Sequence, residues 1–149
     1  MNEGARTPWH LWVVGLLSLV WNGFGAADYT MSQLGNRNWF AGMGFSEEQT
    51  TAVLQFLADS PMWTHAAWAF GVWGAVAGSV LLLLRNRLAV WAFTVSLAGA
   101  VLGLINQKTA DYPPELAEMQ GSPVMYGIVA IAILLLWYAI RMKSSGVIR

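Results

Sequence analysis

Four long runs of the chain, each 20 to 25 residues, contain no Asp, Glu, Lys or Arg and alternate with polar segments. The runs are Thr7–Ala27, Ser60–Leu84, Leu88–Gln107 and Met119–Ile140. At ~1.5 Å per residue, each is long enough as a helix to cross the roughly 30 Å hydrocarbon core of a bilayer. The pattern predicts an all-α integral membrane protein, with four transmembrane helices forming an antiparallel bundle at about residues 8–33, 62–84, 88–107 and 123–141.

A shorter helix is predicted between the first two spans. Ser46 is followed three residues later by Gln49, the spacing of a capping box. Beyond it, apolar residues such as Val53 and Leu57 alternate with polar ones such as Gln55 at helical spacing. We therefore expect an amphipathic helix over about residues 47–59, lying on the outer membrane surface, within a single domain of residues 1–149.

The composition agrees with a membrane protein. Hydrophobic residues make up 56% of the chain and charged residues 11%, against about 25% charged residues in an ordinary soluble domain. This excludes a soluble enzyme, a disordered tail and a nucleic-acid-binding protein. Arg6 and the small residues Gly25-Ala26-Ala27 also resemble a signal peptide around the first run, which we interpret instead as a retained helix.

Charge is distributed unequally between the two sides of a four-span chain. One side receives six basic residues: Arg6, Arg85, Arg87, Arg141, Lys143 and Arg149. The other receives Arg37 and Lys108 with seven of the eight acidic residues. Because basic residues near span ends favour the cytoplasm, both termini are predicted to be cytoplasmic and both long loops external.

Glycines indicate how two of the spans associate. The predicted second helix contains Gly71, Gly74 and Gly78, and the third contains Gly99 and Gly103. Lipid gives helices no hydrophobic reason to associate, so glycine faces that allow close backbone approach supply the contact. We expect these five residues to pack helices 2 and 3 as a hairpin, with Gly74 and Gly99 at similar depth.

Candidate ligand-binding residues come from the polar side chains within the spans. Asn22, Tyr29 and Gln33 lie on one face of the first helix, with Asp28 a quarter-turn away. The outer ends of the other helices add His65, Asn106 and Gln107. Unpaired polar groups are costly in hydrocarbon, so these seven side chains predict a polar pocket that opens outward, with Asp28 at its mouth. Alternatively, Asn22 only joins helices through a hydrogen bond, and Asp28 only anchors the interface beside Arg37 or Lys108.

Other chemistry is not expected. His10 and His65, the only histidines, lie a membrane thickness apart and cannot share a metal, and the chain has no cysteine. The sequence also contains no recognisable nucleophile–base pair or phosphate-binding loop. We therefore predict neither an enzyme nor a cofactor.

Several segments resemble a known family. Trp21-Asn22-Gly23-Phe24-Gly25 and Asp28-Tyr29-Thr30-Met31-Ser32-Gln33 are similar to the Trp-Asn-x-Phe-Gly and Asp-Tyr-x-Met-Thr-Gln motifs of a family of short bacterial four-helix membrane proteins. Phe45-Ser46-Glu47-Glu48-Gln49 also resembles that family. The segment from Trp68 to Arg85 resembles the second helix of that family, and the likeness covers about residues 15–107. Ser32 replaces the usual Thr, and the stretch after Arg37 is longer. The resemblance implies a multi-pass protein of the bacterial inner membrane, in a family sometimes labelled sugar transporter.

Two functional hypotheses follow. The first is a small membrane protein that binds or transports a small neutral solute, such as a sugar, through the outward pocket; transport by so few helices would favour a homodimer. The second is an accessory subunit or assembly factor of a larger membrane complex. Apart from the lipid bilayer, the expected partners are thus a small polar ligand, a second copy or a larger membrane complex.

Overall fold

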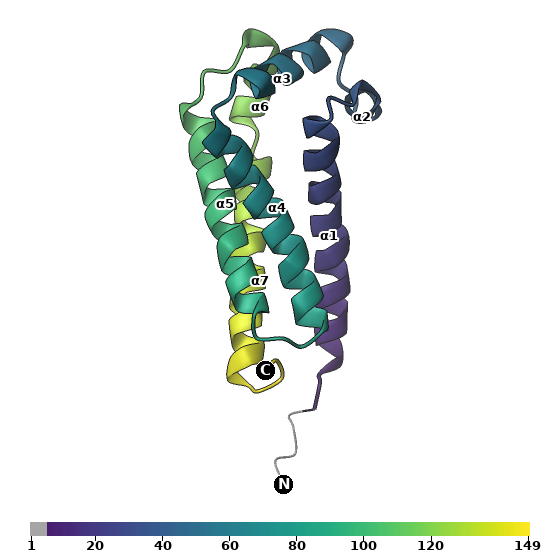
Figure 1. Ribbon diagram of the computed structural model, residues 1–149, viewed down its shortest axis with the longest axis vertical. Coiled ribbons are helices and arrows are strands. Elements are labelled where there is room, and N and C mark those ends of the chain that lie inside the picture. The colour runs from purple at the N-terminus through teal and green to yellow at the C-terminus, as the bar shows by residue number, and fades with distance from the viewer. Residues whose placement is uncertain (1–5) are drawn as a thin grey trace.

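The structure, a computed structural model that describes residues 6–149, is an all-α bundle (Figure 1). Four helical stretches are long and apolar enough to cross a membrane. They contain the four long helices α1 (Trp9–Gln33), α4 (Met62–Leu83), α5 (Ala89–Thr109) and α7 (Val124–Ser144). Their bounds differ from the predicted spans by at most three residues.

The long helices pack mainly in chain order. α4 lies between α1 and α5, and α7 packs on α5 (Figure 1). Near the turn between α4 and α5, all four come together around Leu11, Leu82, Phe93 and Ala139 in the largest buried apolar cluster. His10 of α1 also hydrogen-bonds the Tyr138 hydroxyl of α7 there. This end is therefore the tightly closed end of the bundle.

The predicted contact between α4 and α5 is present, with a different register. A Cβ on Gly99 would lie 2.6 Å from the backbone nitrogen of Gly71. Gly74 faces Ser96 rather than Gly99, and Gly78 faces the Phe93 ring. The expectation that Gly74 and Gly99 lie level was wrong by about one helical turn, because the register was counted from the Arg85–Arg87 turn.

Glycines also lie at the contacts between α5 and α7 and between α1 and α4. Gly103 of α5 was expected to pack against α4, but it faces the terminal methyl of Met125 on α7. Gly15 of α1, which was not singled out, lies against the side chain of Leu83 on α4. Glycines therefore set the approach at each of the three helix pairs, and not only within the α4–α5 hairpin.

Three of the long helices end with the same backbone motif. After α1 and α7, Gly35 and Gly146 take φ of 63° and 71°, and a 6→1 hydrogen bond closes each end. After α4, Asn86 donates the same bond to Leu81, yet the left-handed residue is Arg85, with φ of 55°. A side chain in this conformation is strained, so Arg85 occupies a position that glycine would fill more readily.

Short helices form a cap over the other end of the bundle. They are α2 (Arg37–Gly42), α3 (Glu47–Asp59), the 3-10 turn η1 (Pro114–Leu116) and α6 (Ala117–Gly121). Ser46 and Gln49 form both bonds of the predicted capping box of α3. The apolar face of α3 was expected to lie on lipid, but Val53 is buried against Phe40 and Leu116 in a second small core. α3 therefore packs on the cap of its own chain.

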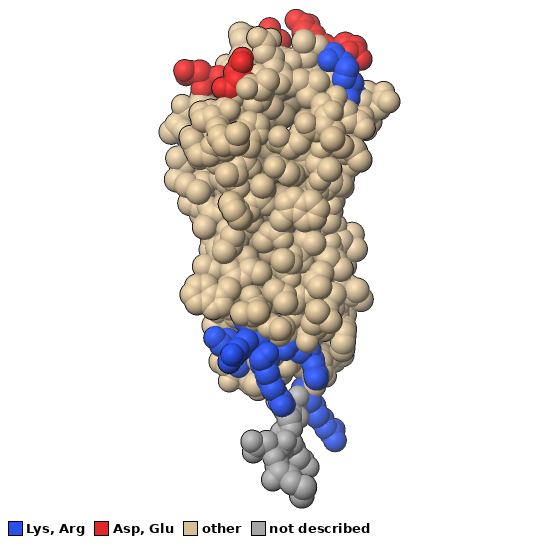
Figure 2. Space-filling model, viewed as in Figure 1, with Lys and Arg blue, Asp and Glu red and all other residues tan. Residues whose placement is uncertain are grey.

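Charged residues gather at the two ends of the bundle (Figure 2). We call the end with the α4–α5 turn the basic end; its described charges are Arg6, Arg85, Arg87, Arg141, Lys143 and Arg149. The capped end, here the acidic end, has the described carboxylates together with Arg37 and Lys108. This is the separation that the charge pattern of the sequence predicts.

Candidate functional site

The polar line of α1 faces α4. Asn22 is 8% exposed and its amide nitrogen donates to the Ser79 hydroxyl at 3.0 Å and to the Ala75 carbonyl at 3.3 Å. Asn106 and Gln107, which the sequence groups with Asn22 in one pocket, lie at the acidic end of α5 and are not its hydrogen-bond partners. The interior position of Asn22 agrees with its sequence interpretation, and its hydrogen bonds join two helices.

The contact between α1 and α4, here called the helix seam, continues toward the acidic end. The Tyr29 ring contacts the Trp68 ring edge-on, with centroids 5.1 Å apart. One turn further, the side-chain amide of Gln33 lies 2.9 Å from Nδ1 of His65, whose Nε2 lies 3.0 Å from the Leu57 carbonyl. Since a carbonyl only accepts, Nε2 of His65 donates to Leu57, and Nδ1 accepts from the amide nitrogen of Gln33. His65 thus connects α1, α3 and α4.

Two further candidates hold the cap. The carboxylate of Asp28 accepts a hydrogen bond of 2.8 Å from the Trp39 indole of α2, rather than pairing with Arg37 or Lys108. Gln107 of α5 is 7% exposed, and its amide nitrogen donates to the carbonyls of Met119, Gln120 and Ser122. Its amide oxygen has no partner among residues 6–149. Gln107 therefore fastens the α6 segment to the bundle.

A groove of about 1040 Å³ lies at the acidic end, between the polar face of α3 and the α5–η1 connection. Asn106 is the single member of the predicted ligand set that lines it. The groove contains three aromatic rings, those of Phe56, Trp63 and Tyr112, and its polar lining includes Thr51, Gln55, Thr109 and the carboxylates Glu47, Glu48, Asp59, Asp111 and Glu115. No Lys or Arg of the described chain lines it. The structure therefore divides the predicted pocket into a helix seam, cap attachments and this groove.

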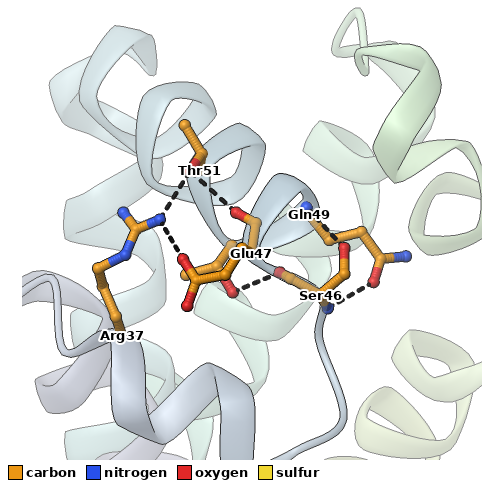
Figure 3. A network of polar contacts seen from close by, with 6 residues as sticks. Arg37, Ser46, Glu47, Gln49 and Thr51 are labelled. Atoms are coloured by element: carbon orange, nitrogen blue, oxygen red, sulfur yellow. Dashed lines mark hydrogen bonds and ion pairs between the residues drawn. The ribbon is translucent and has the colours of Figure 1, made fainter.

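One wall of the groove is held by a polar network (Figure 3). Arg37 of α2 reaches α3, where one guanidinium nitrogen donates to Glu47 at 2.9 Å and to the Thr51 hydroxyl at 2.7 Å. Ser46 and Gln49 cap the first turn of α3 beside it. Arg37 thus ties the start of α3 to α2 and neutralises Glu47, one of the five carboxylates.

Aromatic stacking joins the two walls of the groove. Phe56 of α3 and Tyr112 of the α5–η1 connection stack with ring centroids 4.5 Å apart. Burial raises the pKa of the Tyr112 phenol above its ordinary value of 10.0. The phenol therefore stays protonated at neutral pH and can donate a hydrogen bond.

The lining determines the chemistry that the groove can perform. Ionised carboxylates only accept hydrogen bonds, whereas an Asn amide both donates and accepts. Within residues 6–149, no group of three or more His, Asp or Glu side chains is arranged to hold a metal ion. The arrangement is therefore suited to a ligand that supplies many hydrogen-bond donors.

Sequence reasoning missed the groove because its walls come from two segments that meet only in the folded cap. It also missed α2, although Asn36 provided a signal: its side chain accepts from the Trp39 backbone nitrogen, as an N-cap does. Asn106 was selected for its depth in the third span, and depth alone did not distinguish it from its neighbour Gln107.

Comparisons of the chain with protein-family models, with curated proteins and with solved structures found no match.

Proposed function

We propose that the protein binds a small hydroxyl-rich neutral solute, such as a sugar, in the groove at its acidic end. The observation that carries this proposal is the composition of the groove: hydrogen-bond acceptors on both walls, the Asn106 amide and aromatic surface, in a cavity of about 1040 Å³. This volume suits a small molecule.

The charge of the lining selects among ligands. An anionic solute would be repelled by the carboxylates that Arg37 leaves unneutralised. Sugar hydroxyls can donate to those carboxylates, while Asn106 donates to and accepts from the same ligand. A protonated amine can also donate hydrogen bonds to these carboxylates, so the experiment below includes one.

The proposal places the acidic end outside the cell and both termini in the cytoplasm of a bacterium, with the spans in its inner membrane. The basic residues at the opposite end support this orientation. The groove would then receive its solute from outside.

Saturation-transfer NMR on the full-length protein in lipid nanodiscs tests the proposal, with no glycoside detergent present to compete. The probes are glucose, maltose, glucose 6-phosphate and putrescine. We expect transfer to at least one neutral sugar, weaker transfer to the phosphate, and loss of the sugar signal in Asn106→Leu. The matched variant Asn38→Leu, at an exposed position outside the groove, should retain it.

Two results would contradict the proposal. If neither glucose nor maltose receives saturation transfer, the protein does not bind neutral sugars and the proposed class of solute is wrong. Equal sugar signals from Asn106→Leu and the unmodified protein would remove the groove as the site, and a signal from putrescine alone would reassign it to amines.

Glycines on the outer faces of the bundle favour a second candidate function, that of an accessory subunit. Apart from the nearby backbone of its own helix, a Cβ on Gly23 of α1 or on Gly127 of α7 would meet no atom of the described chain within 4 Å. Open glycines of this kind permit close approach by another transmembrane helix. Affinity capture from native membranes should then recover a stoichiometric partner that Gly127→Leu releases; recovery of the protein alone would exclude this function.

A further inference from the structure

Three arginines meet at the basic end although they are far apart in the sequence. The backbone nitrogen of Arg149 donates to the Arg85 carbonyl at 2.9 Å, and that of Arg87 donates to the main-chain oxygen of Arg149 at 3.0 Å. The tail after α7 thereby lies along the turn between α4 and α5. We call Arg85, Arg87 and Arg149 the turn–tail cluster.

Apolar burial holds this arrangement in place. Val147 and Ile148 are 7% and 2% exposed, and both belong to the closed core at the basic end. The left-handed Gly146 reverses the chain after α7, so that the next two residues enter this core. Arg149 is thus placed on the turn by its neighbours, and its own charge is not needed for docking.

No Asp or Glu side chain among residues 6–149 pairs with the arginines of the cluster. The ion pair that the structure describes, Arg37–Glu47, lies at the acidic end. One guanidinium nitrogen of Arg85 donates to the Thr7 hydroxyl at 2.6 Å, and the side chain remains exposed, as do those of Arg87 and Arg149. The three arginines are therefore neighbours through their backbones and carry exposed guanidinium groups, and an oxyanion would offset the repulsion between these charges.

Arg85 adds an independent observation. Gly35 and Gly146 occupy the equivalent position after α1 and α7, whereas Arg85 adopts the same left-handed conformation with a side chain. Such strain at a non-glycine residue points to a role for the side chain itself. At this position, the side chain adds a guanidinium group to the cluster.

The depth of the cluster identifies the anion. Trp9, Trp91 and Trp137 lie toward the same end of their helices and are 75%, 68% and 61% exposed, as in the aromatic belt at a membrane interface. Lys and Arg side chains gather at this end of the bundle (Figure 2), and the turn and tail that carry the cluster follow the ends of α4 and α7, where a membrane would place its lipid headgroups. Basic sites at this level bind the phosphates of anionic lipids.

We propose that the turn–tail cluster is a binding site for the headgroup phosphate of an anionic phospholipid. Arginine suits this ligand because its planar group donates two parallel hydrogen bonds to phosphate oxygens. The lipid would bridge the α4–α5 turn and the tail after α7, and so stabilise the closed end of the bundle. This site is separate from the groove at the acidic end.

The test measures thermal unfolding of the full-length protein in a neutral detergent, with added phosphatidylglycerol, phosphatidylcholine or inorganic phosphate. We expect phosphatidylglycerol to raise the unfolding temperature well above the other two additions. The variants Arg85→Gly and Arg87→Gln/Arg149→Gln should require at least tenfold more phosphatidylglycerol for half of the effect. Arg85→Gly relieves the strained turn, so it should fold at least as well as the unmodified protein without lipid.

Arg141→Gln/Lys143→Gln is the matched control, since it removes two charges from the same end outside the cluster. It should retain most of the lipid effect. If the control loses as much of the lipid effect as the cluster variants, the lipid is held by general attraction to the basic end and not by a specific site. An equal effect of phosphatidylcholine, full protection by inorganic phosphate, or an unchanged response of both cluster variants would each overturn the proposal.

Discussion

Gly99 of α5 and Gly71 of α4 bring two helix backbones together, and a Cβ on Gly99 would lie 2.7 Å from the Cα of Gly71. Because backbone atoms cannot move aside as a flexible side chain can, even Gly99→Ala must separate the helices. We expect Gly99→Ala to destabilise the fold by about 1–3 kcal/mol, the range for overpacked cores, and Gly99→Leu by more. Thermal unfolding in detergent measures both.

The control for this prediction is Gly23→Ala, on an open face of α1. It should leave the stability unchanged or slightly higher, since alanine favours the helix over glycine. Equal unfolding temperatures for Gly99→Ala and Gly23→Ala would show that the α4–α5 approach is looser than the structure has it.

The Asn22–Ser79 hydrogen bond should contribute a modest part of the stability. Polar contacts between membrane helices contribute roughly 0.6 kcal/mol on average and up to about 1.7 kcal/mol. A double-mutant cycle with Asn22→Leu and Ser79→Ala measures the coupling directly, and we expect a value in this range. Additive effects of the two substitutions would mean that the side chains do not interact.

The capping box and the ion pair at the start of α3 should contribute unequally. Ser46→Ala removes an N-cap bond and should destabilise the cap by about 1 kcal/mol. The Arg37–Glu47 pair is exposed, with side chains 45% and 82% accessible, and such pairs contribute about 0–1 kcal/mol. Hydrogen exchange of the α3 amides should therefore accelerate more in Ser46→Ala than in Glu47→Gln, and the reverse order would contradict this ranking.

The topology can be tested with reporter fusions. A reporter joined after Arg149 by a flexible linker should report the cytoplasm, and one inserted near Gln55 the external side. The linker matters because Val147 and Ile148 are buried. The same location at both positions would exclude the proposed arrangement of four spans.

The spans were predictable because the membrane imposes a simple rule on the sequence: long charge-free runs must be helices. Ser46 and Gln49 located α3 for a similar reason, since a capping box is local. The helix register was not predictable, because Gly71 and Gly74 are equally small and only side-chain packing decides which one faces Gly99.

The candidate site was predicted less well than the fold. The depth of Asn22 along its helix correctly predicted that it faces the interior of the bundle. Depth does not reveal which neighbouring residue accepts its hydrogen bond. Ser79, an inconspicuous serine among apolar residues, is that neighbour. The docking of Val147 and Ile148 was missed because two apolar residues after a span do not indicate where they bind.

The charges of the two ends leave a long uncharged interval between them, bounded by Asp28 and Lys108 on one side and by Arg141 on the other. A transmembrane voltage performs work only on charge that moves along the field, about 2.3 kcal/mol per elementary charge per 100 mV. Helices that slide or tilt within this interval carry no charge through the field. The conformation of the protein should therefore be indifferent to the membrane potential, and an ionophore that collapses the potential should leave it unchanged.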